Sequence, residues 1–519
     1  MKKSLFFLST LSGLLLFAAW PTSPLMPFIF IAWLPLLIVA DQVKTAPRFF
    51  GLAFWALLIW NSGTTWWMWN STDIGTIAAI MFNSMLMTFP WWGYFHLKKK
   101  GKKIGYTSLI AFWMCFEYIH HNWQLSWPWL TLGNVFASYP DTIQWYEYTG
   151  VQGGTLWVLL VNILLYECWL SYQQKSFSKK KGIAVILLLL LPVSVSYLIK
   201  PSLTKEAVQD NIVIVQPNID PYGKFNAGSG AEQIQLLLNL SKQAIDSHTK
   251  MIIWPETAMS IADWQNNISN NLYYQPVFAF SREHPAIHIV SGIETFKNYG
   301  REKATATARE AGDGSYYDAF NAAVHIRNGE ALGFYNKSKL VPGVESLPTF
   351  LNFMAPVFEQ FGGTTGGYGR SESAEVFSTG ANSYVAAPII CYESVYGEYV
   401  GEYVKKGANI LTIMTNDGWW GNTPGHKQHL AYAGLRAIET RKWVARSANT
   451  GISAVIDPTG AVRSSEPWNK MSTIKYAIPV INGTSFYVSM GDYLYKLASL
   501  LSMLLILLKI KDRFIKSKA

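Results

Sequence analysis

The sequence has few charged residues for its length. Only 15% of its 519 residues are Asp, Glu, Lys or Arg, whereas soluble domains carry roughly 25%. The deficit lies in residues 1–200 and 490–509, where charges occur in short clusters, while residues 201–488 have the composition of a soluble domain. This division predicts a membrane-embedded helical bundle joined to one globular domain.

Cysteine is also scarce, and its scarcity excludes two kinds of site. Of the three cysteines, Cys115 and Cys168 lie in apolar runs, and Cys391 is alone in the soluble region. That region therefore has no disulfide framework. The C-x-x-C motif is absent, and His426 and His429 have no further ligands at metal-binding spacing. We expect neither a metal ion nor a cofactor.

The net charge of +10 is not arranged as a nucleic-acid-binding face. Its lysines and arginines cluster beside apolar segments, which is the pattern of membrane topology. On one side of the predicted bundle, the two terminal segments and the segments between spans together carry 18 such residues, in runs such as 98–103 and 175–181. The alternate loops, near 21–25, 68–74 and 121–149, carry none. By the positive-inside rule both termini are cytoplasmic, and no nucleic-acid partner is expected.

Eight apolar stretches are long enough to cross a bilayer. The first could instead be a signal peptide, because Lys2 and Lys3 precede its apolar core, although the residues before Pro21 make a poor cleavage site. We predict seven spans within 1–200, a soluble domain at 201–488 facing the periplasm of a bacterial cytoplasmic (inner) membrane, and a last span with a basic tail at 489–519. The expected spans are 4–20, 24–41, 49–67, 75–96, 105–120, 150–173, 182–199 and 490–509.

The soluble region alternates short apolar runs with amphipathic stretches. Runs that are apolar on both faces indicate strands covered on both sides. Helices are expected at 231–247 and 425–440, and the combination predicts a layered α/β sandwich. The expected strands are 211–217, 251–254, 287–293, 319–326, 384–390, 409–415 and 451–456.

Three of the apolar runs are followed by a reactive side chain, which is where α/β folds place reacting groups. Cys391 is a candidate nucleophile, because a lone thiol outside the cytoplasm has no pairing partner and is open to oxidation. An ordinary thiol is only a few per cent ionised at neutral pH. Glu256 could remove its proton as a general base, and Lys337 could stabilise the thiolate and a later oxyanion.

These segments resemble the nitrilase superfamily, in which Glu, Lys and Cys follow one another in the chain. The resemblance is closest to the apolipoprotein N-acyltransferases, and it covers nearly the whole chain. In the membrane part it includes Glu117, Trp127-Pro128-Trp129-Leu130 with Gly133, and Gly150 and Gly153 before Asn162. In the soluble part it rests on Trp254-Pro255-Glu256-Thr257, Tyr335-Asn336-Lys337, Leu340-Val341-Pro342, Cys391-Tyr392-Glu393, Thr415-Asn416-Asp417-Gly418-Trp419-Trp420-Gly421, Gln428-His429, Arg436-Ala437-Ile438-Glu439 and Arg446-Ser447-Ala448-Asn449.

The resemblance implies a nitrilase-like α-β-β-α sandwich and a two-step acyl transfer. The acyl donor would be a phospholipid, typically phosphatidylethanolamine, and the acceptor the α-amino group of a diacylglyceryl-cysteine at the N-terminus of an apolipoprotein. Cys391 would carry the acyl chain as a thioester, with Glu256 as base and Lys337 as oxyanion partner. By the same correspondence Glu345, Tyr392, Glu393 and Phe225 would support the site or bind substrate.

Three departures from the family pattern concern the surroundings of the site. Gly343 and Val344 stand where the family has Phe-Gly before the supporting glutamate, Phe225 replaces a Trp, and His120 replaces an Arg after the membrane Glu. They leave the Glu256, Lys337 and Cys391 trio intact.

Two other functions stay open. One is a membrane-tethered nitrilase-type amidase that hydrolyses a small amide, although eight spans exceed what an anchor needs. The other is a non-catalytic transporter or lipid-binding scaffold. Glu117 and Glu167 lie within predicted spans, and neither has an obvious basic partner in the sequence. A transporter would show more polar or broken spans.

Overall fold

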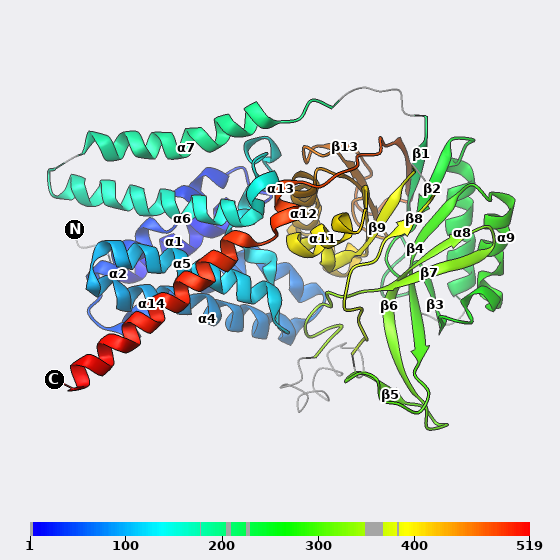
Figure 1. The fold of residues 1–519 in the computed structure, drawn as a ribbon, viewed down its shortest axis with the longest axis horizontal. Coiled ribbons are helices and arrows are strands. Elements are labelled where there is room, and N and C mark those ends of the chain that lie inside the picture. Colours follow the sequence, from blue (N-terminus) through cyan, green and yellow to red (C-terminus); the bar gives the residue numbers. More distant parts are fainter. Residues whose placement is uncertain are drawn as a thin grey trace. The chain divides into compact units, whose positions relative to one another are not determined.

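The computed structural model describes residues 4–176, 178–203, 209–224, 229–347, 367–380 and 383–518. Phe225, one of the predicted supporting residues, lies outside these ranges. The chain divides into two compact units, coloured along the sequence in Figure 1. A helical unit contains Met1–Trp69, Asp73–Lys200 and Met490–Ala519, and a sheet unit contains Asn70–Thr72 and Pro201–Ser489.

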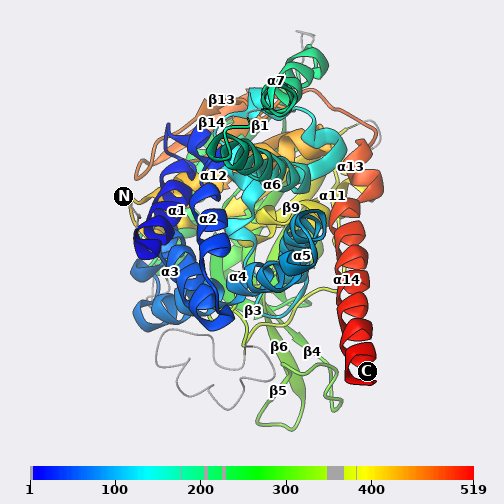
Figure 2. The same cartoon turned by 90° about the vertical axis from the view of Figure 1, so that its left-hand side faces the viewer.

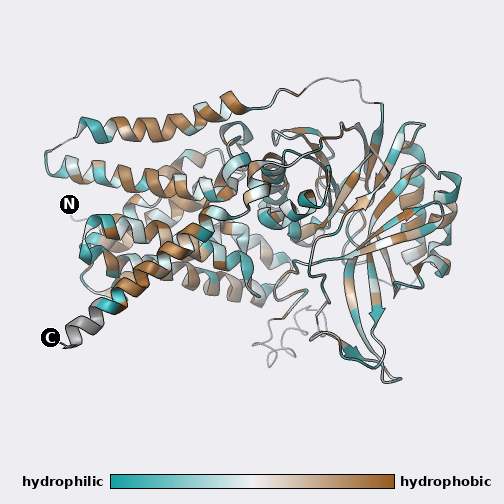
Figure 3. Ribbon diagram, in the orientation of Figure 1, coloured by the Kyte–Doolittle hydropathy of each residue, from teal (hydrophilic) through white to brown (hydrophobic). Residues whose placement is uncertain are grey.

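The helical unit has a helix at each of the eight predicted apolar stretches, and Figure 3 shows how strongly apolar α6, α7 and α14 are. Within the described residues, four helices are long and apolar enough to cross a membrane, namely α4, α6, α7 and α14. Membrane character is thus confirmed, while a count of eight spans stays a prediction. The helices are α1 (Leu5–Ala19), α2 (Leu34–Gln42), α3 (Ala46–Thr65), α4 (Asp73–Leu97), α5 (Lys102–Asn122), α6 (Tyr146–Gln173), α7 (Lys179–Ile199) and α14 (Tyr493–Lys518).

Short 3-10 helices join these longer ones. Two positions in this unit require glycine, one because of a close approach and one because of a positive φ. A Cβ atom at Gly133 would lie 1.9 Å from the carbonyl oxygen of Val151, and Gly150 has a φ of +60° where α6 kinks. The 3-10 helices are η1 (Met26–Phe30), η2 (Trp66–Asn70), η3 (Lys98–Lys100), η4 (Pro128–Leu130), η5 (Leu132–Phe136) and η6 (Pro140–Thr142).

Two carboxylates in the helical unit have different kinds of partner, neutral hydrogen-bond donors in one case and lysines in the other. Glu117 on α5 is buried and accepts hydrogen bonds from the Leu132 backbone and from three side chains: Trp113, Thr155 and Tyr495. Glu167 on α6 does have basic partners, contrary to the sequence-based expectation, because lysines from two other helices reach it. The ammonium groups of Lys102 and Lys181 lie 3.3 and 2.7 Å from its oxygens. Figure 2 shows α5 between α4 and α14, both of which it contacts.

The sheet unit is built from two sheets. In the described residues the larger sheet has the strand order β14-β1-β2-β4-β6-β5, with β3 on β4 and β7 on β6, and the smaller has the order β13-β12-β11-β10-β9-β8. The strands are β1 (Asn211–Gln216), β2 (Thr249–Ile253), β3 (Met259–Trp264), β4 (His288–Asn298), β5 (Arg309–Glu310), β6 (Tyr316–Arg327), β7 (Glu330–Asn336), β8 (Phe377–Ser378), β9 (Val385–Ile390), β10 (Ile410–Thr415), β11 (Trp443–Ala448), β12 (Ala454–Ile456), β13 (Val462–Ser465) and β14 (Ser472–Ala477).

The two sheets face each other, and helices cover their outer sides. Ser447 on β11 donates a hydrogen bond across the interface to the carbonyl of Val215 on β1, at 2.7 Å. Apolar side chains of α8 and α9 pack against β1, β2 and β4 in one buried cluster, and α11 and α12 contact β9 and β11. The predicted α-β-β-α sandwich is therefore confirmed. Its helices are α8 (Ser229–Ala244), α9 (Gln275–Glu283), α11 (Gly397–Lys405) and α12 (Pro424–Thr440), and α13 (Phe486–Met490) follows the last strand.

Each predicted strand coincides with an observed one, and the central strands β1, β2 and β4 run parallel, as do β9, β10 and β11. Parallel strands bring their carboxyl ends to one edge of a sheet. The three reactive segments all follow strand ends, so the fold can gather them.

Candidate active site

Cys391 stands at a sharp turn between β9 and the 3-10 helix η10 (Cys391–Val395). Its φ is +49°, in the left-handed region that residues with a side chain seldom adopt. Such strain persists only where the surroundings impose it, and it is concentrated at functional sites. The turn presents a thiol that is 8% exposed at the end of a buried strand.

Glu256 and Lys337 reach the same place from the other sheet. Glu256 follows β2 and Lys337 follows β7, and their side chains form an ion pair of 3.0 Å. Both residues are buried, and the charges of both act on the Cys391 thiol. The structure thus brings together the three side chains that the sequence singled out.

These contacts, together with burial, determine whether each of the three side chains is charged. Burial alone would raise the pKa of Glu256, but the Lys337 ammonium and hydrogen bonds from Asn321, Lys337 and Cys391 lower it. Burial opposes the charge of Lys337, yet Glu256 and Glu345 hold its pKa well above the usual value. Burial, reinforced by the charge of Glu256, raises the pKa of the Cys391 thiol. The resting site therefore holds a carboxylate, an ammonium and a protonated thiol.

Glu345, predicted as a supporting residue, is the second carboxylate on Lys337. Its Oε1 accepts a hydrogen bond from the Lys337 ammonium at 2.8 Å, and its Oε2 accepts one from the Val341 backbone at 2.8 Å. Asn321 on β6 donates to both Glu345 and Glu256, at 3.0 and 2.8 Å. Asn321 was not predicted, because an isolated Asn inside a strand carries no motif.

Glu393, also predicted, joins the segments that carry Lys337 and Cys391. It is fully buried and accepts hydrogen bonds from the Ser338 backbone at 2.7 Å and the Tyr335 hydroxyl at 2.5 Å on one side. On the other side it accepts one from the Ile390 backbone at 2.9 Å. Glu393 therefore sets the spacing between the cation and the nucleophile.

Tyr392 is buried next to the nucleophile. Its ring packs edge-on against Tyr396, with 5.3 Å between ring centroids. The structure thus places Tyr392 in the short helix that follows Cys391.

A buried polar group lies behind the thiol. The Thr415 hydroxyl, at the end of β10, is 3.3 Å from the Cys391 sulfur and 2.8 Å from a carboxylate oxygen of Asp417. Asp417 also accepts hydrogen bonds from His429 and Arg446. Burial would raise the pKa of Asp417, but the charges of Arg446 and His429 lower it. These residues lie in motifs noted in the sequence, but their contact with the thiol depends on the fold.

Lys224 is a further buried cation that the sequence did not indicate. Its ammonium donates to the carbonyl oxygen of Glu256 at 3.0 Å and to the Thr257 hydroxyl at 2.7 Å. Burial lowers the pKa of Lys224 to about 8, against the opposing charges of Glu256 and Glu294. It therefore holds the turn that carries the base.

The Thr415 contact leads to a prediction. Replacing Thr415 with Val keeps the side-chain shape and removes a hydroxyl that can donate to a developing thiolate. Hydrogen bonds to charged groups contribute about 1.5–3 kcal/mol, so we expect the acylation rate of Cys391 to fall about 10- to 100-fold. Thr412→Val is the matched control, because the Thr412 hydroxyl is buried on the same strand and donates to the Ala387 carbonyl. Equal acylation rates in the two variants would exclude a role for the Thr415 hydroxyl.

In the described residues, no three His, Cys, Asp or Glu side chains converge as metal ligands do. A thiol, a carboxylate and an ammonium in this arrangement are the groups that covalent catalysis by a cysteine requires.

Comparison with known proteins agrees with this arrangement. Residues 12–164 match the model of the apolipoprotein N-acyltransferase N-terminal domain, and residues 212–484 match that of the carbon-nitrogen hydrolases. The second match confirms the predicted nitrilase-like fold.

Similar proteins include an apolipoprotein N-acyltransferase of Chlorobaculum tepidum, 30% identical over 94% of this chain and 93% of the relative. Another, of Geobacter metallireducens, is 26% identical over 94% of this chain and 92% of the relative. Among solved structures, a mutant amidase from Nesterenkonia sp. AN1 with an acetamide group on its active-site cysteine is 15% identical. It covers 54% of this chain and 94% of its own, with a TM-score of 0.36.

Proposed function

Because this chain belongs to the apolipoprotein N-acyltransferase family and is a membrane acyltransferase, we propose that it moves an acyl chain from a phospholipid to a lipoprotein amine through Cys391. The observation that carries this proposal is the convergence of Glu256, Lys337 and Cys391 from three strand ends. The acceptor is the α-amino group of an N-terminal diacylglyceryl-cysteine, and phosphatidylethanolamine is the proposed donor.

In the first step Glu256 takes the thiol proton while the sulfur attacks the ester carbonyl of the phospholipid. The Lys337 ammonium and the backbone N–H next to Cys391 stabilise the negative oxygen of the tetrahedral intermediate. Collapse of the intermediate breaks the ester C–O bond. The departing alkoxide takes the proton from Glu256 and leaves as a lysophospholipid, and the acyl chain stays on the sulfur as a thioester.

In the second step the neutral amine of the acceptor attacks the thioester carbonyl. Glu256 takes a proton from the attacking nitrogen, and Lys337 again faces the negative oxygen. When the C–S bond breaks, the sulfur leaves as a thiolate and recovers the proton from Glu256. The products are an amide and the original thiol, so the trio returns to its starting charges.

The purified full-length protein and a phosphatidylethanolamine labelled in one acyl chain test this proposal. Without acceptor, we expect lysophospholipid and a Cys391 thioester in equal amounts, seen by intact mass spectrometry. A diacylglyceryl-cysteinyl peptide should then remove the label from the protein as an amide. Labelled free fatty acid in place of thioester and amide would instead favour a hydrolase.

The pH dependence of alkylation tests the role of the base. Because the pKa of Glu256 is lowered and that of the thiol is raised, Glu256 is ionised throughout pH 6–8 and can assist iodoacetamide alkylation of Cys391 at a nearly constant rate. In Glu256→Gln only the thiolate fraction reacts, and burial, the largest cause of its raised pKa, persists. The alkylation rate of that variant should therefore rise about tenfold per pH unit. A flat profile in both proteins would show that the proton goes elsewhere.

The distribution of lysine and arginine supports a bacterial inner-membrane location with the sheet unit facing the periplasm. A membrane-impermeant maleimide on spheroplasts tests it, in a chain whose Cys115, Cys168 and Cys391 are replaced by Ser. An Asp313→Cys variant should react before lysis, and a Lys179→Cys variant only after it, since both positions are exposed. The reverse order would overturn the orientation.

A further inference from the structure

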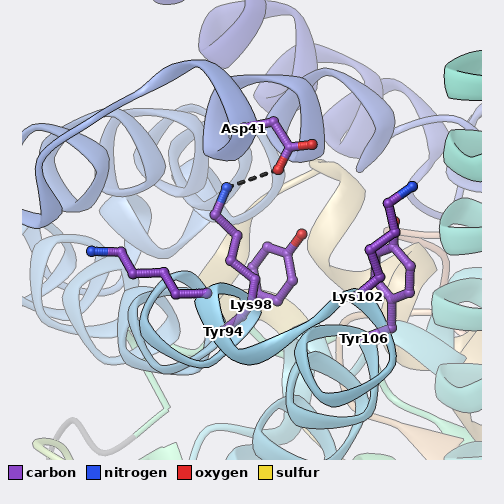
Figure 4. Close-up of a pocket in the computed structure, with 6 residues that line it drawn as sticks. Asp41, Tyr94, Lys98, Lys102 and Tyr106 are labelled. Atoms are coloured by element: carbon purple, nitrogen blue, oxygen red, sulfur yellow. Dashed lines mark hydrogen bonds and ion pairs between the residues drawn. The ribbon is translucent and has the colours of Figure 1, made fainter. Parts of the chain in front are cut away.

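The helical unit contains a cavity with charged residues and tyrosines in its wall, and the acyl-transfer chemistry does not use it. Its volume is about 270 Å³. It lies where the end of α2 meets the α4–η3 junction and the first turns of α5, the end of the unit that carries the lysine runs. It is lined by Asp41, Tyr94, Lys98, Lys99, Lys102 and Tyr106 (Figure 4).

One lining hydroxyl has no protein partner. Tyr94 is 2% exposed and lines the cavity, and its hydroxyl makes no hydrogen bond to any described residue. Figure 4 shows the Tyr94 ring beside Lys98, both rising toward the same space below Asp41. The Tyr94 hydroxyl can therefore donate its proton to a ligand atom that enters the cavity.

The carboxylates near the cavity are already engaged. Asp41 accepts a hydrogen bond from Lys98 at 2.8 Å on one oxygen and one from the Tyr166 hydroxyl on the other. Glu167 accepts from Lys181, Lys102 and the Tyr106 hydroxyl. Each of the two carboxylates therefore already has a lysine and a tyrosine hydroxyl as partners.

Positive charge is in excess around the cavity. Four ammonium groups lie at or near the cavity, compared with two carboxylates, those of Asp41 and Glu167. The ammonium groups belong to Lys98, Lys99, Lys102 and Lys181. In the described part of the chain Lys99 contacts only the Phe95 ring and has no acidic partner. An unneutralised lysine next to an unpartnered hydroxyl donor favours an anionic ligand over a cation or an apolar one.

We propose that this cavity binds the phosphate of an anionic phospholipid, such as phosphatidylglycerol, from the leaflet on the lysine-rich side of the bundle. Lys99 and Tyr94 donate to phosphate oxygens, and Lys98 and Lys102 supply further positive charge. A headgroup site suits this position, because basic pockets between helices on the cytoplasmic side bind anionic lipids. The acyl chains would lie along exposed apolar side chains of α4 such as Phe89 and Trp92. The inference is independent of the proposed acyl transfer.

Native mass spectrometry of the full-length protein, released from phosphatidylcholine-containing micelles, tests the site. With phosphatidylglycerol added, we expect one lipid to be retained more tightly than phosphatidylcholine. Tyr94→Phe, which keeps the ring, and Lys99→Gln should each weaken that retention about tenfold, the effect of losing one hydrogen bond to a charged group. Lys103→Gln is the matched control, because Lys103 is an exposed neighbour outside the cavity and should bind as the parent does.

Two results would overturn the proposal. One is equal retention of phosphatidylglycerol by the parent, Tyr94→Phe and Lys99→Gln, provided that their melting temperatures without added lipid agree. The other is protection by free anion, in which inorganic phosphate raises the melting temperature of the parent as much as phosphatidylglycerol does. The second result would assign the cavity to a soluble phosphate.

Discussion

Cys391→Ala is expected to abolish both the acyl-enzyme and the transfer of label to the acceptor peptide. No other side chain of the trio is a nucleophile of comparable strength, and removal of a catalytic nucleophile costs on the order of four or more powers of ten in rate. The measurement is the rate of amide formation with labelled phosphatidylethanolamine, together with the intact mass of the protein.

The controls for this prediction lie in the same chain. Cys115 and Cys168 are free cysteines of the helical unit, and Cys115→Ala and Cys168→Ala should transfer label at the parent rate. The melting temperature of Cys391→Ala should be close to that of the parent, because Ala and Cys bear the same backbone strain at a φ of +49°. A thioester that survives in Cys391→Ala would assign the nucleophile to another residue.

Lys337→Met should have the second largest effect, and it should lower both activity and stability. The ammonium lies between Glu256 and Glu345, at 3.0 and 2.8 Å, and is 1% exposed. Without it, the buried carboxylate of Glu256 and the partly buried carboxylate of Glu345 face each other without a cation. Breaking a buried pair in this way costs about 3–5 kcal/mol, and loss of an oxyanion donor costs about 10²- to 10³-fold in rate.

The pH dependence of that stability loss has a definite sign. In the parent, the lowered pKa of Glu256 contributes stability that is present above the unfolded-state pKa and is lost as the pH falls through the folded-state value. In Lys337→Met one carboxylate must take up a proton, so the variant should gain stability relative to the parent as the pH falls from 7 to 5. Melting temperatures of the full-length proteins at the two pH values provide the measurement.

A second substitution separates the two effects of Lys337. Adding Glu345→Gln to Lys337→Met removes one of the unneutralised carboxylates and should restore much of the melting temperature, whereas the rate should stay low. Recovery of both quantities would mean that Lys337 only neutralises charge and does not act on the reaction.

The main features of the site could be predicted because each lies in a local pattern. Glu256, Lys337 and Cys391 follow apolar strands, and strand ends converge in an α/β fold. The partners of those residues could not be predicted, since Asn321 sits in the middle of β6 and Thr415 meets the thiol only when β9 and β10 pair. Contacts between residues far apart in the chain leave no periodic trace in one sequence.

The same limit applies to the helical unit. The apolar runs predicted where the helices lie, because periodicity and length are local properties. The lysine partners of Glu167 come from two other helices, Lys102 of α5 at a separation of 65 residues and Lys181 of α7 at 14, so helix packing decides both contacts. The tryptophans of the loops differ in burial, which composition does not show. Trp67 and Trp129 are buried against each other, while Trp66 is about half exposed.

The left-handed backbone of Cys391 also limits which residues can replace it without strain. A β-branched side chain is strongly disfavoured at positive φ, because both substituents on Cβ crowd the backbone. A threonine at position 391 would meet this crowding, as Thr257 does at the same φ of +49°, whereas serine lacks the extra methyl group. The less strained route from a thiol to an alcohol nucleophile at this turn therefore leads through serine.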